Sequence, residues 1–376
     1  MDTIGVGLIG TGFIGKAHAL AYNSVKPIFG DVPLPRRLLL CDLDAKVAAA
    51  KAAEFGFERS TSSWREMIAD PAIQLISIAT WNGTHKQIAI AALEAGKHVW
   101  CEKPMALSLK HAEEMAAAAR KAKGLVTVMG YNYVKNPAIQ NMKRLIADGV
   151  IGKVIDVRGN VDEDYMADPQ LPWSWRLKAE DAGLGTLGDI TSHLISLVHE
   201  TVGPIAKLSA ILDTVHKTRP LIDKPGEFGA VENDDVAHAV VRFRNGARGV
   251  LASSRVAHGR KSMIRLEVHG DKGMLVFDQE RMNELHLYTA DGPKETRGFK
   301  TILTGPQHPP YDRFCPAPGH QLGFLDLKAI ELAHVLKAIK GQEKPHLSFE
   351  EGLKIEYVID AIVRSAKSGA WADVAE

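Results

Sequence analysis

Three glycines near the start of the chain have the spacing of a turn that binds phosphate groups. Gly10, Gly12 and Gly15 follow an apolar run over 4–9 and directly precede a helical stretch. In such a turn the first glycine permits a sharp bend, the second lets the backbone approach a pyrophosphate, and the third lets the helix pack close to the strand. The helix N-terminus adds free N–H groups and partial positive charge. We therefore expect a dinucleotide to contact Gly10, Thr11, Gly12, Phe13, Ile14 and Gly15.

An acidic residue at the end of the second apolar run, Asp42, favours NAD over NADP. An acid at this position accepts hydrogen bonds from the adenine ribose hydroxyls and repels a 2′-phosphate. Asp42 lies 27 residues after Gly15, more than the roughly 20 of the usual fingerprint, and we assign the extra length to an enlarged loop over 27–35. No Arg or Lys directly follows Asp42. The alternative is that Asp42 or Asp44 caps the next helix, a role that suits Asp44.

A carboxylate and an imidazole are spaced so that they share one face of a helix. Asp189 and His193 are four residues apart in a helical stretch. The carboxylate can fix the imidazole tautomer and raise its basicity, which makes His193 a candidate general base near neutral pH. The spacing alone does not separate this role from a structural Asp–His contact inside an ordinary helix.

The elements that must position these residues begin with alternating strands and helices. Strands are predicted over 4–9, 37–41, 75–79, 98–101 and 125–129, with a weaker one near 57–59. Helices are predicted over 13–23, 45–55, 63–70, 84–95 and 108–123, with Thr84 and Ser108 as candidate N-caps. This alternation predicts an α/β fold with a doubly wound parallel sheet, a Rossmann domain, over 1–130.

After residue 130 the pattern changes to long strands separated by turns. Strands are predicted over 153–161, 207–214, 235–244, 247–254, 262–269, 274–277 and 285–288, and helices over 138–148, 187–201, 322–340 and 348–368. Asn245-Gly246 is a strong signal for a β-hairpin, and 270–273 for another turn. We therefore expect residues 131–376 to form an α+β domain on a large, mostly antiparallel sheet.

Length and composition narrow the class of protein. The 376 residues suit two domains, and the formal net charge of +1 gives no support for binding nucleic acid or an anionic membrane. No apolar run is long enough to span a bilayer, and no metal-binding motif is present. Cys41, Cys101 and Cys315 are scattered and odd in number, which favours reduced thiols. Because the first strand begins by residue 4, we expect no signal peptide and a cytoplasmic location.

Two further stretches follow predicted strands at the edge where open α/β sheets bind ligands. They read Ile-Ala-Thr-Trp-Asn-Gly-Thr-His over 78–85 and His-Val-Trp-Cys-Glu-Lys-Pro over 98–104. Together with the glycine turn they resemble the glucose–fructose oxidoreductase/inositol dehydrogenase/MocA family. The resemblance extends over the whole chain and includes Tyr131-Asn132, 151–154, Trp175-Arg176, 188–193 and 348–352. Trp81 departs from the proline usual at its position, which leaves the conformation of that loop open.

The resemblance implies the residues that act on the substrate. Lys103 would lie beside the nicotinamide and the reacting hydroxyl, where its ammonium stabilises the negative charge that grows on oxygen as hydride leaves carbon. His193, oriented by Asp189, would take the alcohol proton. The reverse assignment, with Lys103 as base and His193 as the orienting group, stays open. Outside the family, Lys103 could equally be a solvated surface lysine.

The resemblance also implies wider sets of contacts. Besides the glycine turn and Asp42, the cofactor would contact Thr80, Trp81, Asn82, His85, Glu102, Lys103, Asn132, Trp175 and Arg176. The substrate would contact Lys103, Tyr131, Asn132, Arg176, Asp189, His193 and His320. Several of these have plain structural alternatives, because strand-end acids and aromatic residues near domain junctions often only pack.

The function implied is that of an NAD-dependent dehydrogenase acting on a sugar, a sugar derivative or a cyclitol such as an inositol. Two alternatives on the same fold are an NAD-dependent glycoside hydrolase and a catalytically silent regulator that senses nucleotides. The intact set of Lys103, Asp189 and His193 argues against the regulator. By analogy with the family we also expect a homo-oligomer, a dimer or tetramer, formed through the C-terminal sheet.

Overall fold

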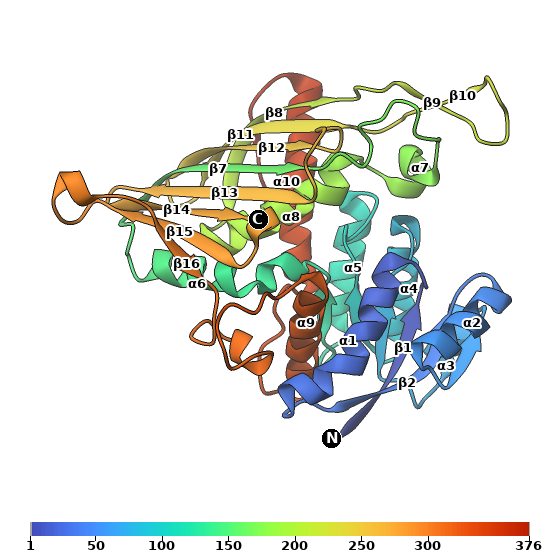
Figure 1. Ribbon diagram of the computed structural model, residues 1–376. Coiled ribbons are helices and arrows are strands. Elements are labelled where there is room, and N and C mark those ends of the chain that lie inside the picture. Colours follow the sequence, from blue (N-terminus) through green and yellow to red (C-terminus); the bar gives the residue numbers. More distant parts are fainter. Residues whose placement is uncertain (1, 376) are drawn as a thin grey trace. The chain divides into compact units, whose positions relative to one another are not determined.

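The chain forms two compact units in the computed structural model, which describes residues 2–375 (Figure 1). The first unit contains the residues up to Asn132 together with Gly323–Leu353. The second contains Tyr133–Leu322 and the residues from Lys354 onward. No helix in this described part of the chain combines the length and apolarity needed to cross a membrane.

The first unit contains the predicted doubly wound sheet. Its six strands are all parallel and lie in the order β3-β2-β1-β4-β5-β6. The strands are β1 (Thr3–Ile9), β2 (Leu34–Cys41), β3 (Arg59–Thr61), β4 (Leu75–Ile78), β5 (His98–Cys101) and β6 (Thr127–Met129). The helices are α1 (Phe13–Phe29), α2 (Ala45–Phe55), α3 (Trp64–Ala69), α4 (Asn82–Glu94), α5 (Leu109–Lys121) and α9 (Phe324–Ile339). Because the order reverses between β1 and β4, the carboxyl ends of these strands form the usual ligand-binding edge.

One segment far along the chain belongs to the first unit. The prediction placed everything after residue 130 in a second domain, whereas Gly323–Leu353 packs with the first unit. Its helix α9 lies along α1, with the rings of Phe13 and Phe324 stacked at 5.5 Å. Beyond α9, the N–H of Met129 in β6 donates to the carbonyl of Leu347 at 2.7 Å. Local patterns could not reveal this return, because it depends on contacts across some 200 residues of sequence.

Two local predictions in the first unit are wrong. The stretch over 27–35 is not an enlarged loop, because α1 continues through Pro27 to Phe29 and β2 already begins at Leu34. The ammonium of Lys26 donates to the carbonyls of Gly30 and Val32, directly after the helix end, at 2.6 and 2.8 Å. Thr84 is not an N-cap, since α4 begins at Asn82 and Thr84 lies inside its first turn.

The second unit is built on a nine-stranded sheet in the order β16-β15-β14-β13-β7-β12-β11-β8-β17. Strands β7 and β12 pair in parallel and the other neighbours pair antiparallel, as predicted for a mostly antiparallel sheet. The strands are β7 (Val154–Asp162), β8 (Ile205–Asp213), β11 (Val236–Phe243), β12 (Arg248–Ser254), β13 (Met263–Gly270), β14 (Gly273–Asp278), β15 (Glu284–Thr289), β16 (Lys300–Leu303) and β17 (Ala372–Asp373). A separate pair, β9 (Thr218–Pro220) and β10 (Phe228–Ala230), was not predicted.

The hairpin at Asn245-Gly246 is confirmed, since it joins β11 to β12 with Gly246 at a φ of +90°. Buried and exposed residues alternate along these strands, because one face of the sheet is covered and the other is open. The helices are α6 (Pro137–Ala147), α7 (Ala179–Ala182), α8 (Ser192–Thr201) and α10 (Phe349–Ser368), the last of which begins in the first unit. The predicted helix over 187–201 is divided, because a π-helical turn, η3 (Leu187–Thr191), precedes α8.

Candidate active site

The glycine turn between β1 and α1 has the geometry that a dinucleotide requires. Gly10 has a φ of +100°, and a Cβ on it would lie 2.4 Å from the carbonyl oxygen of Ala79. A Cβ on Gly15 would lie 2.1 Å from the carbonyl oxygen of Gly10. A Cβ on Gly12, in contrast, would meet no atom of residues 2–375 within 4 Å. Two glycines therefore serve the fold, and the third keeps open the space in which a pyrophosphate can approach the backbone.

The two acids after β2 have separate positions. The hydroxyl of Thr11, in the glycine turn, donates to Oδ2 of Asp42, which holds this carboxylate beside the turn. Asp44 is the N-cap of α2 and accepts from the N–H groups of Lys46 and Val47 at 2.7 and 3.2 Å. Because Asp44 supplies the cap, Asp42 is left in the position that suits a ribose contact, which stays a prediction.

Glu102 belongs to a network of charged groups buried inside the first unit. Its Oε1 accepts from the ammonium of Lys328, and His18 Nε2 lies 2.8 Å from the same oxygen. Lys328 also pairs with Glu331 at 2.9 Å. Trp100 stacks on His18 at 3.7 Å and donates from Nε1 to Glu331. The network ties β5, α1 and α9 together directly before Lys103.

Burial and charge pairing act on the pKa values of the groups in this network, and for Glu102 they act in opposite directions. Burial lowers the pKa of His18 to about 4, so its ring is neutral at pH 7 and carries its proton on Nε2 to donate to Glu102. Burial alone would raise the pKa of Glu102, but Lys328 and His18 outweigh it and hold that pKa well below its usual range. The carboxylate of Glu102 is thus ionised and already bonded to His18 and Lys328. Its predicted contact with the cofactor stays a prediction.

Lys103 follows Glu102 and is half-buried, with a cis peptide bond to Pro104. The ring of His85 supports this turn, because its Nδ1 lies 2.9 Å from the carbonyl oxygen of Pro104 and its Nε2 3.2 Å from that of Thr80. Burial lowers the pKa of His85, so the ring is neutral and donates to one carbonyl at a time. The structure therefore shows His85 linking two backbone turns.

The remaining predicted residues of the first unit differ in exposure. Trp81 precedes α4 and is 51% exposed, while Thr80 and Asn82 on either side of it are half-buried. Tyr131 and Asn132 are buried. Nδ2 of Asn132 has no hydrogen-bond partner among residues 2–375. A buried amide donor of this kind suits a ligand acceptor, as the prediction for Asn132 requires.

In the second unit, Asp189 lies in the π-helical turn and His193 in the first turn of α8. Tyr165, in the loop after β7, donates its hydroxyl to Oδ2 of Asp189 at 3.0 Å. The ring of Tyr133 lies 4.4 Å from that of His193, which is 6% exposed. Burial and the charge of Asp189 raise the pKa of Tyr165 well above its usual value, so Tyr165 keeps the proton that it donates. Sequence reasoning missed Tyr165, because no spacing links the loop at 165 to the helix at 189.

The last predicted contacts lie on loops of the second unit. Trp175 and Arg176 form a short 3₁₀ turn, η2 (Trp175–Leu177), in which the guanidinium lies 4.7 Å from the tryptophan ring. Arg176 is exposed, and its carbonyl oxygen accepts from Asn233 at 2.8 Å. His320 is also exposed, and its carbonyl oxygen accepts from the hydroxyl of Tyr311.

The fold and these residues define a two-domain nicotinamide oxidoreductase, and comparison with known proteins agrees. Residues 4–130 match the oxidoreductase family with an NAD-binding Rossmann fold, and residues 139–276 match the GFO/IDH/MocA C-terminal domain. The chain belongs to this family, so the resemblance seen in the sequence is confirmed.

Among its relatives, the chain is 40% identical to levoglucosan dehydrogenase of Pseudarthrobacter phenanthrenivorans, over 100% of this chain and 99% of that one. A solved structure of levoglucosan dehydrogenase in complex with NADH and levoglucosan is 41% identical, with a TM-score of 0.96 over 99% of both chains. The 1,5-anhydro-D-fructose reductase of Ensifer adhaerens is 29% identical over 98% of both chains.

Proposed function

We propose that this chain is an NAD-dependent dehydrogenase that oxidises a ring hydroxyl of levoglucosan or a closely related pyranose. The similarity to levoglucosan dehydrogenase carries this proposal, because it extends over the full length of both chains and includes a structure with cofactor and sugar bound. In levoglucosan the anomeric carbon is locked in an internal acetal. The reacting carbon must therefore be one that bears a secondary hydroxyl.

The chain's own residues supply the acid–base chemistry of this reaction. NAD, when bound, supplies the hydride acceptor. Lys103 donates a hydrogen bond to the substrate oxygen and stabilises the negative charge that develops there. His193 removes the hydroxyl proton, with Asp189 as the group that orients the imidazole and Tyr165 as the donor that holds Asp189. An exchange of roles between Lys103 and His193 is the alternative within the same mechanism.

The proposal specifies NAD as the preferred cofactor. Asp42 stands beside the glycine turn, where its charge disfavours a 2′-phosphate, and the next residue is the apolar and 81% exposed Leu43. The proposal also places the enzyme in the cytoplasm, where its free thiols stay reduced.

The proposal includes a homo-oligomer formed through the open face of the nine-stranded sheet. Val240 in β11 and Val250 in β12 lie opposite each other and are 49% and 47% exposed. Ile211 in β8 lies on the same face and is 63% exposed. Exposed apolar side chains grouped in this way are typical of protein–protein contacts.

A panel of sugars tests the proposed function through the formation of NADH. We expect turnover with levoglucosan and NAD that exceeds turnover with glucose or myo-inositol. Lys103→Met should abolish turnover while NADH still binds, because the ammonium is lost and the glycine turn is intact. No NADH from any of these substrates would refute the proposal. Release of an aglycone from a glycoside without net NADH would favour the hydrolase.

A further inference from the structure

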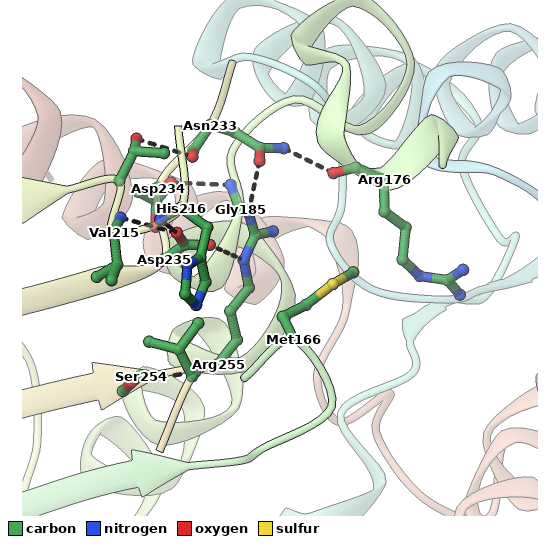
Figure 2. A network of polar contacts seen from close by, with 12 residues as sticks. Met166, Arg176, Gly185, Val215, His216, Asn233, Asp234, Asp235, Ser254 and Arg255 are labelled. Carbon is green, nitrogen blue, oxygen red and sulfur yellow. Dashed lines mark hydrogen bonds and ion pairs between the residues drawn. The ribbon is translucent and has the colours of Figure 1, made fainter. Parts of the chain in front are cut away.

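Three consecutive residues before β11 form a buried polar cluster that the proposed mechanism does not use (Figure 2). Asn233, Asp234 and Asp235 are 5%, 6% and 0% exposed. Arg255, directly after β12, is 2% exposed and is the cation of the cluster. Buried carboxylates are costly unless each is paired or hydrogen-bonded, so the partners of each one show what it holds in place.

The pair of Arg255 and Asp235 is the anchor of this cluster. Nε of Arg255 lies 2.8 Å from Oδ1 of Asp235, and Oδ2 of Asp235 accepts from the N–H groups of Val215 and His216. Nη2 of Arg255 donates to Oδ1 of Asn233 at 2.8 Å. The charge of Asp235 is therefore satisfied within the cluster and by two amides of the loop that follows β8.

Asp234 has a different set of partners, all at the start of the π-helical turn. Its Oδ1 accepts from Gly185 N at 2.8 Å and its Oδ2 from Leu187 N at 2.7 Å, while its carbonyl oxygen accepts from Thr186 N at 2.9 Å. Thr186, at the N-cap position, makes no capping bond with its own side chain. Asp234 thus caps η3 from another part of the chain, satisfying amides that the helix itself leaves without acceptors.

The fit between Asp234 and this turn is close. A Cβ on Gly185 would lie 1.9 Å from the carbonyl oxygen of Asp234, so the turn and the cluster are in direct backbone contact. Asp189 lies two residues beyond Leu187, and His193 follows in the first turn of α8.

The same cluster holds two other segments of the proposed site. Nδ2 of Asn233 donates to the carbonyl oxygen of Arg176, whose side chain points away from the cluster in Figure 2. The carbonyl oxygen of Arg255 accepts from Met166 N at 3.0 Å, and Met166 follows Tyr165. One run of three residues and its arginine are therefore bonded to the segments that carry Tyr165, Arg176 and Asp189.

We propose that Asp234 and Asn233 are positioning residues for the dehydrogenase reaction. Asp234 fixes the π-helical turn that carries Asp189 and leads into α8, where His193 lies. Asn233 fixes the turn that carries Arg176. This inference rests on the proposed function. In the proposed mechanism Asp189 and His193 serve proton transfer, whereas Arg176 contacts the substrate and the cofactor. Asp234 should therefore affect mainly kcat, and Asn233 mainly KM.

Two isosteric substitutions test the proposal on the full-length enzyme. Asp234→Asn keeps the shape but offers one acceptor oxygen where two amides need one each. It should lower kcat by about 10- to 100-fold, the scale of a misplaced catalytic group, and leave the KM for sugar within about two-fold. Asn233→Asp keeps the acceptor for Arg255 but removes the donor to the carbonyl oxygen of Arg176 and the longer bond, at 3.4 Å, to that of Gly183. It should raise the KM for sugar or NAD at least several-fold with a smaller effect on kcat.

Asp271→Asn is the matched control, because Oδ1 of Asp271 also accepts a backbone N–H, from Lys153, with no bond to these segments. It should leave both constants unchanged. Hydrogen exchange gives a readout independent of turnover: Asp234→Asn should speed exchange over 185–193, and the control should not.

Equal loss of kcat in both cluster variants, or wild-type kcat per folded molecule in Asp234→Asn, would overturn the proposal. If Asp234→Asn does not fold, two other results would overturn the proposal. One is a wild-type KM in Asn233→Asp, and the other is hydrogen exchange of the amides over 185–187 of the wild-type enzyme that is as fast as in exposed turns. A wild-type enzyme that oxidises no sugar would instead overturn the proposed function.

Discussion

Adding a methyl group at Gly15 or at Gly12, in separate variants, should distinguish the glycine that the fold needs from the glycine that cofactor binding needs. Replacing Gly15 by Ala puts a Cβ 2.1 Å from the carbonyl oxygen of Gly10, more than 1 Å inside ordinary contact. Gly10 cannot move away easily, because its N–H is bonded to Cys41 at 2.9 Å and it lies against Ala79. We expect Gly15→Ala to lower the free energy of unfolding by roughly 3 kcal/mol, the upper end of overpacking costs.

Gly12→Ala should have the opposite outcome. Gly12 has a φ of −67° and a ψ of −168°, which alanine adopts without strain, and its Cβ would meet no atom of the described residues within 4 Å. Restriction of the unfolded chain and a poorer N-cap roughly offset each other, so we expect the free energy of unfolding to change by less than about 1 kcal/mol. The methyl group would occupy the space proposed for the pyrophosphate, so NADH affinity should fall by at least ten-fold.

Urea unfolding and a fluorescence titration with NADH measure the two effects separately. Normal NADH affinity in Gly12→Ala would show that the pyrophosphate binds elsewhere. Wild-type stability in Gly15→Ala would show that the helix does not pack on the turn as described.

Three further predictions concern charged groups. Because the pKa of His18 is about 4 in the folded protein and about 6.5 when unfolded, stability should fall as pH drops from 6.5 to 4, by up to roughly 3 kcal/mol, and His18→Gln should flatten this dependence in urea unfolding. Lys328→Met leaves two buried carboxylates without their cation and should cost about 3–5 kcal/mol, whereas Lys337→Met, which breaks partly exposed pairs, should cost less than about 1 kcal/mol. Asp42→Ser with Leu43→Arg should shift the ratio of kcat/KM values from NAD toward NADP.

Each of these has a result that contradicts it. A pH dependence of stability that is equally steep in His18→Gln would place the titrating group elsewhere. Equal losses of stability in Lys328→Met and Lys337→Met would show that the internal network contributes no more than a surface pair. An unchanged cofactor ratio in the double variant would move the ribose contact away from Asp42.

The sequence predicted those features that depend on neighbours along the chain. The parallel sheet, the glycine turn, the cap at Asp44 and the hairpin at Asn245-Gly246 all follow from spacings of a few residues. The extension of α1 through Pro27 was missed, because proline usually ends or kinks a helix, whereas here two further helical residues follow it.

Features that depend on distant residues could not be predicted in this way. Lys328 is 226 residues from Glu102 in the chain, and Asp234 is 47 residues from Leu187. Periodicity carries no information on such pairs, and buried charges far from a motif resemble surface charges in a sequence. The role predicted for Lys103 came from family resemblance, and those predicted for Asp189 and His193 came from their spacing together with the same resemblance. Tyr165 and Asp234, which bond to Asp189 and to the start of its turn, are known from the folded chain alone.

The assignment of Gly323–Leu353 to the first unit has a consequence for biosynthesis. A ribosome releases the glycine turn and Glu102 early, but Lys328, the cation that neutralises Glu102, emerges only after eight of the nine strands of the large sheet have been translated. The nucleotide-binding half is thus begun first and finished almost last. A nascent chain stalled before residue 323 would carry an uncompensated acid in an uncovered core, an attractive target for chaperones and proteases.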